Sequence, residues 1–416
     1  MDLTKPEQML LWATEIAISG EHTDSLHAIE TNSDLMQHAQ IHKLLPLVVD
    51  AVYSQPSAID WPEFPLYQRN TRIQVLQQAQ RSKEFLDAYA KLQEGGILPL
   101  VVKGCVCRAV WPKGDLRQSA DEDLLVRDED FSRACAVLRE LGLVCDESAD
   151  PKKDFEIGWR RPNSTLYIEL HRRLFAPDSA LGAELEALFD GAFDRAQEYE
   201  VEHGAAKVRS MSPEDHLLYL ILHAYKHFIY SGFGIRQVCD VGLWAKRYAA
   251  EIDHPRLMKQ LDQVHALYFA AAVFAIARED LGIDLHLQEC WNGIQVDREP
   301  MLRDLLDAGI YGGSTMSRQH SAPMTVEAVR AARSGQQQEG LLRRIFPRRE
   351  ALERQYPELR EHPGQLPLVW GRRLAKYRRE IRSDTNNSPA ESLRIARERL
   401  TLLKLYGILP DRTGKR

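Results

Sequence analysis

The sequence has few cysteines and no long apolar run. Six cysteines in 416 residues are too few for a disulfide framework, and no C-x-x-C pair is present, so a zinc site built from cysteines is not expected. The longest apolar run, Leu267 to Ala277, is too short to span a bilayer. The first residues lack the basic start and apolar core of a signal segment. These absences predict a cytoplasmic protein with no membrane partner.

Charge of neither sign dominates the whole chain, but its distribution is uneven. The net charge of -6 indicates no particular partner. Residues 340–416 hold 19 Lys and Arg against 9 Asp and Glu, a net charge of +10, so residues 1–339 carry -16. A basic segment of this size can meet nucleic acid, a phosphorylated ligand or the acidic remainder of the chain. The sequence leaves these three possibilities open.

Hydrophobic periodicity divides the chain into helical and strand-like parts. Helical spacing predicts helices within 5–94, including 34–53 and a long helix ended by Gly95 and Gly96. Short apolar runs at 97–103, 121–126, 154–161 and 164–174 predict strands, with a helix over 128–143. Ser212, Pro213 and Asp215 mark the start of another helix, followed by helices over 235–252 and 261–282. The polar stretch 331–340 predicts a loop.

This order predicts an α+β, mostly helical fold with a small mixed sheet flanked by helical regions. We expect four regions, listed here by residue number: an N-terminal helical region over 1–94, an α/β core over 95–210, a helical domain over 211–330 and a basic helical C-terminal region over 331–416.

Two acids stand at the start of a predicted strand. Asp121 and Asp123 are two residues apart, so a strand would place both carboxylates on one face, with Glu122 on the other. Two neighbouring carboxylates repel each other unless a cation lies between them, and Mg²⁺ prefers oxygen ligands together with substrate phosphates. A solvated strand end is the alternative, because so short a motif has a high false-positive risk.

Neighbouring residues favour the metal site. Lys103 and Gly104 end the preceding strand, where a lysine can bind phosphate and a glycine lets backbone amides approach an anion. Arg117 can clamp a phosphate oxygen. Glu169 lies on a later apolar strand with His171 on the same face, and a buried glutamate needs a partner that a shared metal would provide.

Two helices carry further polar pairs. His216, His223 and His227 share one helix face, and the last two have the spacing of a metal site, although a polar helix face that lines a cleft is the alternative. Arg236 and Asp240 are four residues apart, which fits either a surface ion pair or a cleft that holds a base or acceptor.

These motifs together resemble a known family. The segments that carry the resemblance, in chain order, are "VVKG", "RQSADEDLLV", "YIELH", "HAYKH", "RQVCD", "LLRRIFPRREALERQYP" and "LPLVWGRRLAKYRR". The pattern is similar to the nucleotidyltransferase superfamily of DNA polymerase beta, and more narrowly to a bacterial family of uncharacterised nucleotidyltransferases. The resemblance covers most of the chain from about residue 96 onward. Three positions depart from the superfamily pattern: Cys105 replaces a serine, Glu122 replaces an apolar residue, and Glu169 replaces the commoner aspartate.

The resemblance implies a magnesium-dependent transfer of a nucleoside monophosphate, AMP from ATP, to an unidentified acceptor with release of pyrophosphate. Asp121, Asp123 and Glu169 would be catalytic and hold Mg²⁺ or Mn²⁺. The nucleotide would contact residues from several elements, namely Lys103, Gly104, Arg117, His171, His223, Arg236 and Asp240. The acceptor can be a small molecule, a peptide or protein, or RNA. The alternatives are a non-catalytic nucleotide-binding regulator and a toxin-like enzyme that adds nucleotides to RNA.

Overall fold

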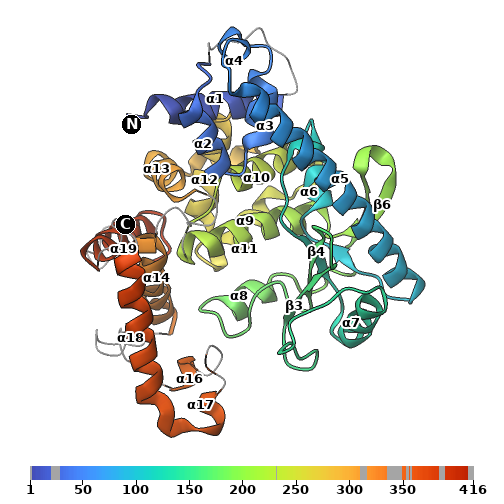
Figure 1. Ribbon diagram of the computed structural model, residues 1–416, viewed down its shortest axis with the longest axis vertical. Coiled ribbons are helices and arrows are strands. Elements are labelled where there is room, and N and C mark those ends of the chain that lie inside the picture. Colours follow the sequence, from blue (N-terminus) through green and yellow to red (C-terminus); the bar gives the residue numbers. More distant parts are fainter. Residues whose placement is uncertain are drawn as a thin grey trace.

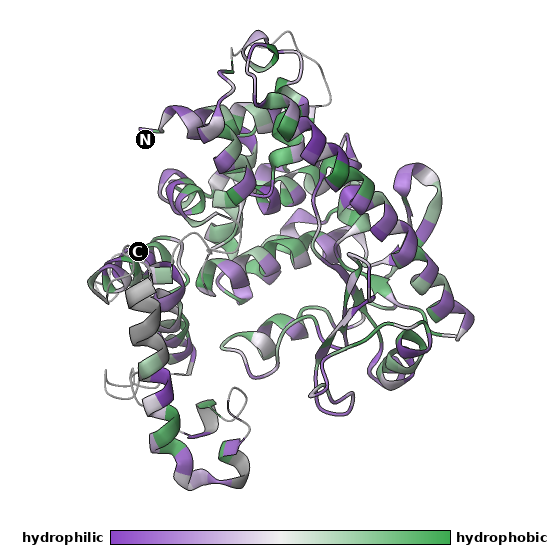
Figure 2. Ribbon diagram, in the orientation of Figure 1, coloured by the Kyte–Doolittle hydropathy of each residue, from purple (hydrophilic) through white to green (hydrophobic). Residues whose placement is uncertain are grey.

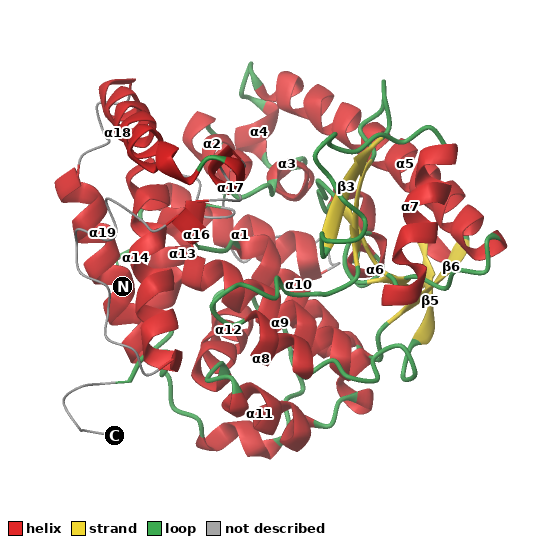
Figure 3. Cartoon of the chain, turned by 90° about the horizontal axis from the view of Figure 1, so that it is seen from below, coloured by secondary structure: helices red, strands yellow, loops and turns green. Residues whose placement is uncertain are grey.

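The structure is a computed structural model that describes residues 2–19, 29–230, 232–309, 316–334, 349–352, 356, 358–383 and 389–410. Helices make up most of it, and the strands lie together at one side of the molecule (Figure 3). The predicted α+β, mostly helical class is confirmed. The division into four regions stays a prediction.

Five helices precede the first strand. They are α1 (Lys5–Ser19), α2 (Ser33–Ile41), α3 (Leu45–Val52), α4 (Pro56–Ile59) and α5 (Phe64–Glu94). The helix α5 ends as predicted, because Gly95 is its C-cap and Gly96 takes a φ of 72° that favours glycine. The single helix predicted over 34–53 is wrong. Lys43 has a φ of 57° and separates α2 from α3.

A four-stranded mixed sheet forms the core of the next part of the chain (Figure 1). Its strands are β1 (Leu100–Val101), β2 (Glu122–Leu125), β3 (Glu156–Arg160) and β4 (Tyr167–His171), in the order β1-β2-β4-β3. The two central strands, β2 and β4, are parallel, while β1 and β3 pair antiparallel with them at the edges. The helix α6 (Cys105–Arg108) lies between β1 and β2, α7 (Phe131–Glu140) lies between β2 and β3, and α8 (Gly182–Ala187) follows β4.

A second, two-stranded sheet was not predicted from the sequence. It consists of β5 (Gln197–Val201) and β6 (Ala206–Ser210), which form an antiparallel hairpin. In β5 only Tyr199 and Val201 are buried. The remaining three residues of that strand are polar and exposed, so its apolar signal is weak.

The central helix α9 (Pro213–Tyr230) begins where the capping signal predicts. The hydroxyl of Ser212 accepts the backbone N–H of Asp215 at 3.2 Å. Hydrophobic residues colour much of α9 and of its neighbours in Figure 2. Those neighbours are α10 (Ile235–Arg247), α11 (His254–Gln263), α12 (Leu267–Glu279) and α13 (Glu299–Ala308). The single helix predicted over 261–282 is wrong, because His265 has a φ of 54° and separates α11 from α12.

The C-terminal helices are α14 (Met316–Ser334), α16 (Arg349–Leu352), α17 (Glu358–Glu361), α18 (Leu366–Ser383) and α19 (Pro389–Leu405). Two of them, α14 and α19, supply hydrogen-bond donors to the end of α9. Arg399 of α19 donates to the backbone carbonyls of Phe228 and Tyr230, and the Thr325 hydroxyl of α14 donates to that of Ile229 at 2.7 Å. These donors satisfy carbonyls that the last turn of a helix leaves unpaired. The loop predicted over 331–340 is helical up to Ser334, and the rest lies outside the described residues.

None of the helices in the described ranges is long and apolar enough to cross a membrane.

Candidate functional site

Three side chains converge where β2 and β4 run side by side. The parallel register places Asp123 directly opposite Glu169, and His171 follows two residues later on the same face. His171 Nε2 lies 3.3 Å from Asp123 Oδ1 and 3.7 Å from Glu169 Oε2. Ligand atoms of all three residues lie within 4.8 Å of one another. The pairing of two distant strands thus assembles two carboxylates and an imidazole.

Lys103 supplies the nearest positive charge. Its Nζ lies 3.0 Å from Asp123 Oδ1 and 3.3 Å from the Nε2 of His223 on α9. Burial lowers the pKa of Lys103, but the charge of Asp123 outweighs this and holds the pKa well above its usual value. Burial and the nearby ammonium keep the pKa of His223 well below its usual value. A neutral His223 can therefore accept a hydrogen bond from the Lys103 ammonium.

One oxygen of the Asp123 carboxylate makes no hydrogen bond among the described residues. The side chain is fully buried, and this oxygen is Oδ2. Burial raises the pKa of Asp123, but Lys103 and His171 more than compensate, so its pKa lies below the usual range. Burying an ionised oxygen without a hydrogen-bond partner is unfavourable for the free energy of folding unless a cation binds to it.

Glu169 behaves differently from its neighbour. Burial, together with the charge of Asp123, raises the pKa of Glu169 to about 7, although Lys103 opposes the shift. Two adjacent carboxylates cannot both ionise freely without a cation between them. The donor set of Asp123, Glu169 and His171 therefore fits a divalent metal ion.

Asp121 lies one residue before β2 and is half-buried. It does not belong to the converging group of three ligands, which is the only such group among the described residues. It lines a small pocket together with Lys103, Gly104, His223 and Arg236. The structure thus places Asp121 beside the site rather than within its closest donor set.

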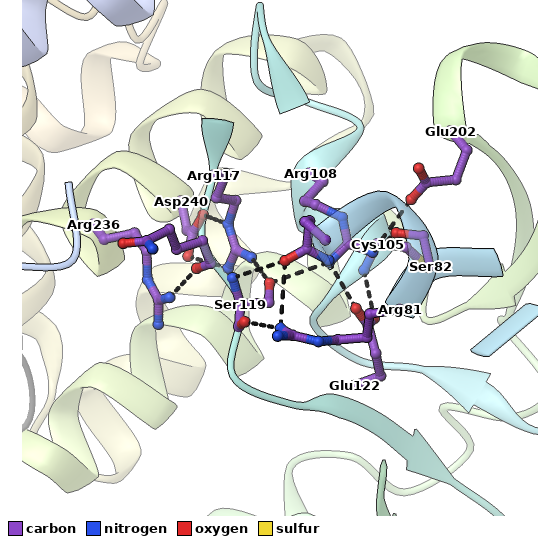
Figure 4. Close-up of polar contacts among 12 residues, drawn as sticks. Arg81, Ser82, Cys105, Arg108, Arg117, Ser119, Glu122, Glu202, Arg236 and Asp240 are labelled. Carbon is purple, nitrogen blue, oxygen red and sulfur yellow. Dashed lines mark hydrogen bonds and ion pairs between the residues drawn. The ribbon is translucent and has the colours of Figure 1, made fainter. Parts of the chain in front are cut away.

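Glu122 points away from the metal face, as the strand period predicts. Its Oε1 lies 2.7 Å from Arg108 Nη1, and its Oε2 accepts the backbone N–H of Cys105 at 2.9 Å (Figure 4). Gly104 has a φ of 61°, and a Cβ at this position would overlap Glu122 Oε2. The anion that approaches Gly104 and Cys105 is therefore the chain's own Glu122 carboxylate.

Arg117 and Asp240, both predicted to contact nucleotide, bind each other. Two guanidinium nitrogens of Arg117 lie 2.7 Å from the two oxygens of Asp240, and Trp111 Nε1 donates to the same carboxylate at 2.8 Å. Asp240 and Arg236 are both buried, so the alternative of a surface ion pair between them does not fit, and both residues line the pocket beside Asp121. Arg236 also donates to the Gln118 carbonyl.

Several arginines fix the loop before Asp121 (Figure 4). The Ser119 hydroxyl accepts from Arg117 at 2.6 Å and from Arg108 at 3.2 Å, while its carbonyl accepts from Arg81. Sequence reasoning missed Arg81 and Arg108, because their partners lie far along the chain and no local pattern marks them.

The histidines of α9 do not form a second metal site in the described structure. His223 and His227 contact each other edge to face with ring centroids 4.5 Å apart, and neither belongs to the converging ligand group. His216 is fully buried, stacks on Trp244 and lies 2.9 Å from the Ser210 hydroxyl. The alternative of a polar helix face fits His223 and His227, and His216 is a core residue.

Lys226 is a further cation that faces the site. It is half-buried three residues after His223, and the charges of Glu156, Glu169 and Asp123 act on its pKa. No ion pair joins it to a carboxylate within the described part of the chain. Burial and Lys103 lower its pKa. Sequence reasoning missed Lys226, although its position three residues after His223 in the motif "HAYKH" was a signal that could have found it.

Comparison with known proteins adds an independent observation. The model of the family described as uncharacterised nucleotidyltransferase matches residues 30–282, more than half of the chain. No curated protein and no solved structure matches it. The matched segment contains β2, β4 and α9, which hold the site described above. The chain therefore belongs to the family of uncharacterised nucleotidyltransferases, and it is a nucleotidyltransferase enzyme.

Proposed function

We propose that the enzyme transfers AMP from ATP to an acceptor hydroxyl, with release of pyrophosphate, at the site of Asp123 and Glu169. We also place its sheet in the superfamily of DNA polymerase beta. The observation that carries the proposal is the buried, unpartnered Oδ2 of Asp123 beside Glu169 and Lys103. Carboxylates with an open position beside a lysine suit a metal-bound triphosphate.

Asp123, Glu169 and His171 would hold a divalent ion, with Asp121 close by. When bound, such an ion neutralises phosphate oxygens and stabilises the charge that develops at the reacting phosphorus. Lys103 keeps its positive charge at neutral pH, because its pKa lies well above its usual value next to Asp123. Its ammonium can therefore move between Asp123 and a phosphate oxygen without losing a proton.

The helices α9 and α10 supply the remaining positive charge near the site, through Lys226 and Arg236. Lys226 has no acidic partner in the described structure, and Arg236 lines the same pocket as Lys103 and Asp121. We assign the triphosphate to Lys103, Lys226 and Arg236. Arg117 is instead a structural residue, because Asp240 and Ser119 occupy its guanidinium.

Glu169 is suited to accept the proton of the acceptor hydroxyl. Burial and the charge of Asp123 raise the pKa of Glu169 to about 7 in the metal-free protein, and an ion between the two carboxylates would lower it, so that Glu169 is ionised and able to accept a proton at neutral pH. The carboxylate has two oxygens, so one can face the ion while the other faces the acceptor.

Glu122 supports a second candidate function, a nucleotide-binding regulator without transferase turnover. Its carboxylate occupies the Cys105 N–H at the start of α6, so a phosphate cannot use that donor. A third candidate, transfer to RNA, rests on the net charge of +10 over residues 340–416. The hydroxyl acceptor, the choice of ATP as nucleotide and the cytoplasmic location predicted from the sequence are likewise parts of this proposal.

Labelled ATP, CTP, GTP and UTP, each with Mg²⁺ or Mn²⁺, would be incubated with the full chain and a panel of peptides, RNA and small alcohols. Pyrophosphate release and label transfer are measured. Asp123→Asn should abolish both, whereas Asp87→Asn, an exposed acid on α5, should change neither. Tight nucleotide binding without label transfer to any acceptor would favour the regulator, and RNA binding that weakens steeply with salt would favour the RNA-directed enzyme.

A further inference from the structure

His171 differs in chemistry from the other members of the converging group. Mg²⁺ takes oxygen ligands almost exclusively, whereas a neutral imidazole suits first-row transition ions. The two carboxylates of Asp123 and Glu169 serve either kind of ion. The nitrogen of His171 therefore decides which ion the site prefers.

The positions of the three donors fit a common ion. Ligands about 2.0 to 2.2 Å from one metal lie about 3 to 4.4 Å from each other. His171 Nε2 lies 3.3 Å and 3.7 Å from the nearest oxygens of Asp123 and Glu169. The 3.3 Å distance is to Oδ1 of Asp123, which Lys103 also contacts, whereas the buried Oδ2 of the same carboxylate has no hydrogen-bond partner among the described residues. The carboxylate can therefore serve the ion and Lys103 together.

The opposite edge of the imidazole faces a carboxylate, although the buried Nδ1 of His171 has no hydrogen-bond partner among the described residues. The antiparallel register pairs His171 with Glu156 of β3, and the Glu156 carboxylate lies 3.4 Å from His171 Nδ1. A metal-bound histidine usually turns its other nitrogen to a carboxylate, which fixes the ring and makes it a better ligand. The side chain of His171 is buried, so the ring has little room to turn.

We infer that the ion lies in a mixed oxygen and nitrogen site, with His171 Nε2 as a direct ligand, and that the enzyme selects Mn²⁺ over Mg²⁺. Mn²⁺ is the transition ion that also accepts carboxylate and phosphate oxygens readily. The inference rests on the proposed function for its metal-bound nucleotide, but the metal preference belongs to the free protein and is measured without any substrate.

The test titrates the metal-free full chain with Mn²⁺, follows the free ion by electron paramagnetic resonance, and then adds Mg²⁺ as competitor. The wild type should need at least about a tenfold excess of Mg²⁺ to displace half of the Mn²⁺. Pulsed measurements should detect coupling of the bound Mn²⁺ to one nitrogen. Circular dichroism and thermal melts of each metal-free variant establish that it is folded.

His171→Asn should weaken Mn²⁺ binding by about 10-fold or more, remove the nitrogen coupling and leave Mg²⁺ affinity nearly unchanged. His171→Asp should shift the preference to Mg²⁺, because it supplies a third carboxylate. Glu156→Gln keeps all three donors and should weaken Mn²⁺ binding less, which provides a test if His171 variants do not fold. His203→Asn, on an exposed histidine, is the matched control and should change nothing.

Equal affinity of the wild type for Mg²⁺ and Mn²⁺, or an unchanged Mn²⁺ affinity in folded His171→Asn, would overturn the inference. These results separate it from the proposed function. Selective Mn²⁺ binding without nucleotide transfer would leave the metal site and reject the transferase reaction. Nucleotide transfer by a protein without metal preference would support the transferase reaction and reject the Mn²⁺-selective site.

Discussion

The carboxylate of Glu122 and the guanidinium of Arg108 form an ion pair at 2.7 Å with both side chains buried. Arg108 also donates to Ser82 at 3.0 Å and lies 3.2 Å from Glu202. Glu122 in turn accepts the Cys105 N–H, so the pair ties the start of β2 to the turn that follows Lys103. Glu122 therefore holds β2, which carries Asp123, and the turn after Lys103 in one arrangement.

Removing one member of this pair should be strongly destabilising. Glu122→Gln removes the shorter of the two ion pairs of the buried Arg108 and leaves only the partly exposed Glu202 as its partner, which costs up to about 3 to 5 kcal/mol in the free energy of unfolding. Urea titration measures this loss. Replacing both partners, as in Glu122→Gln with Arg108→Met, should recover part of it, because neither fully buried charge remains and Glu202 is partly exposed. The exposed pair of Lys83 and Asp87 is the control, and its removal should cost less than about 1 kcal/mol.

Gly104→Ala should lower the free energy of unfolding much more than Gly96→Ala. Both glycines have positive φ, 61° and 72°, but a Cβ at Gly96 would meet no atom within 4 Å. We expect Gly96→Ala to cost about 1 to 2 kcal/mol through backbone strain alone. At Gly104 the overlap with Glu122 adds to that strain, so the loss of stability should be several-fold larger. Similar melting temperatures for the two variants would contradict this reading of the turn.

Lys226→Met should separate binding from stability. The pKa of Lys226 is lowered by burial and by Lys103, so its charge is unfavourable in the folded chain. Removing the charge should leave the free energy of unfolding equal or higher. The KM for the nucleotide should nevertheless rise about 10-fold or more, because the proposed contact of Lys226 with the triphosphate would be lost. Lys226→Arg should retain most of the affinity, and Lys259→Met, on α11, serves as control for loss of a lysine elsewhere.

Acid should destabilise the fold partly through His216. Burial lowers its pKa from 6.5 to about 3, so below pH 6.5 the unfolded chain takes up a proton that the folded chain refuses. Its contribution is therefore lost as pH falls from 6.5 towards 3, by about 2 kcal/mol between pH 7.5 and pH 5. His216→Gln lowers stability at every pH through packing. Its decline between these two pH values, measured by urea titration, should be about 2 kcal/mol smaller than that of the wild type.

Arg399→Met should loosen the end of α9. It removes the donors to the Phe228 and Tyr230 carbonyls, and hydrogen bonds from a charged group contribute about 1.5 to 3 kcal/mol each. Hydrogen exchange at the last turn of α9 should become faster. Arg394→Met on the same helix removes only exposed contacts with Glu391 and Glu398, so exchange in α9 should not respond to it.

Local patterns were sufficient for part of the site. The alternation of Asp121, Glu122 and Asp123 predicts which side chain turns away, and the spacing of Glu169 and His171 predicts their shared face. Both expectations depend only on the period of a strand. The capping signal at Ser212 likewise located the start of α9, because a cap depends on residues within one turn.

Contacts between residues far apart in the chain could not be predicted from the sequence. Arg117 and Asp240 are 123 positions apart, and nothing near either residue indicates that they bind each other. The parallel register that sets Asp123 against Glu169 also depends on how two strands meet. The breaks at Lys43 and His265 were missed because helical periodicity continues across both, while each backbone takes a positive φ.

The acid triplet 121–123 has a consequence for how this family tolerates change. Its three residues are chemically alike, yet Glu122 and Asp123 serve opposite faces of β2. A one-residue insertion or deletion in the loop 117–120 would keep the composition of the strand and exchange the two faces. After an insertion, Asp121 would face Arg108 and Glu122 would take the place of Asp123. Both faces of β2 would still meet a carboxylate, but the side chain towards Arg108 would be one methylene shorter and the one beside Glu169 one methylene longer.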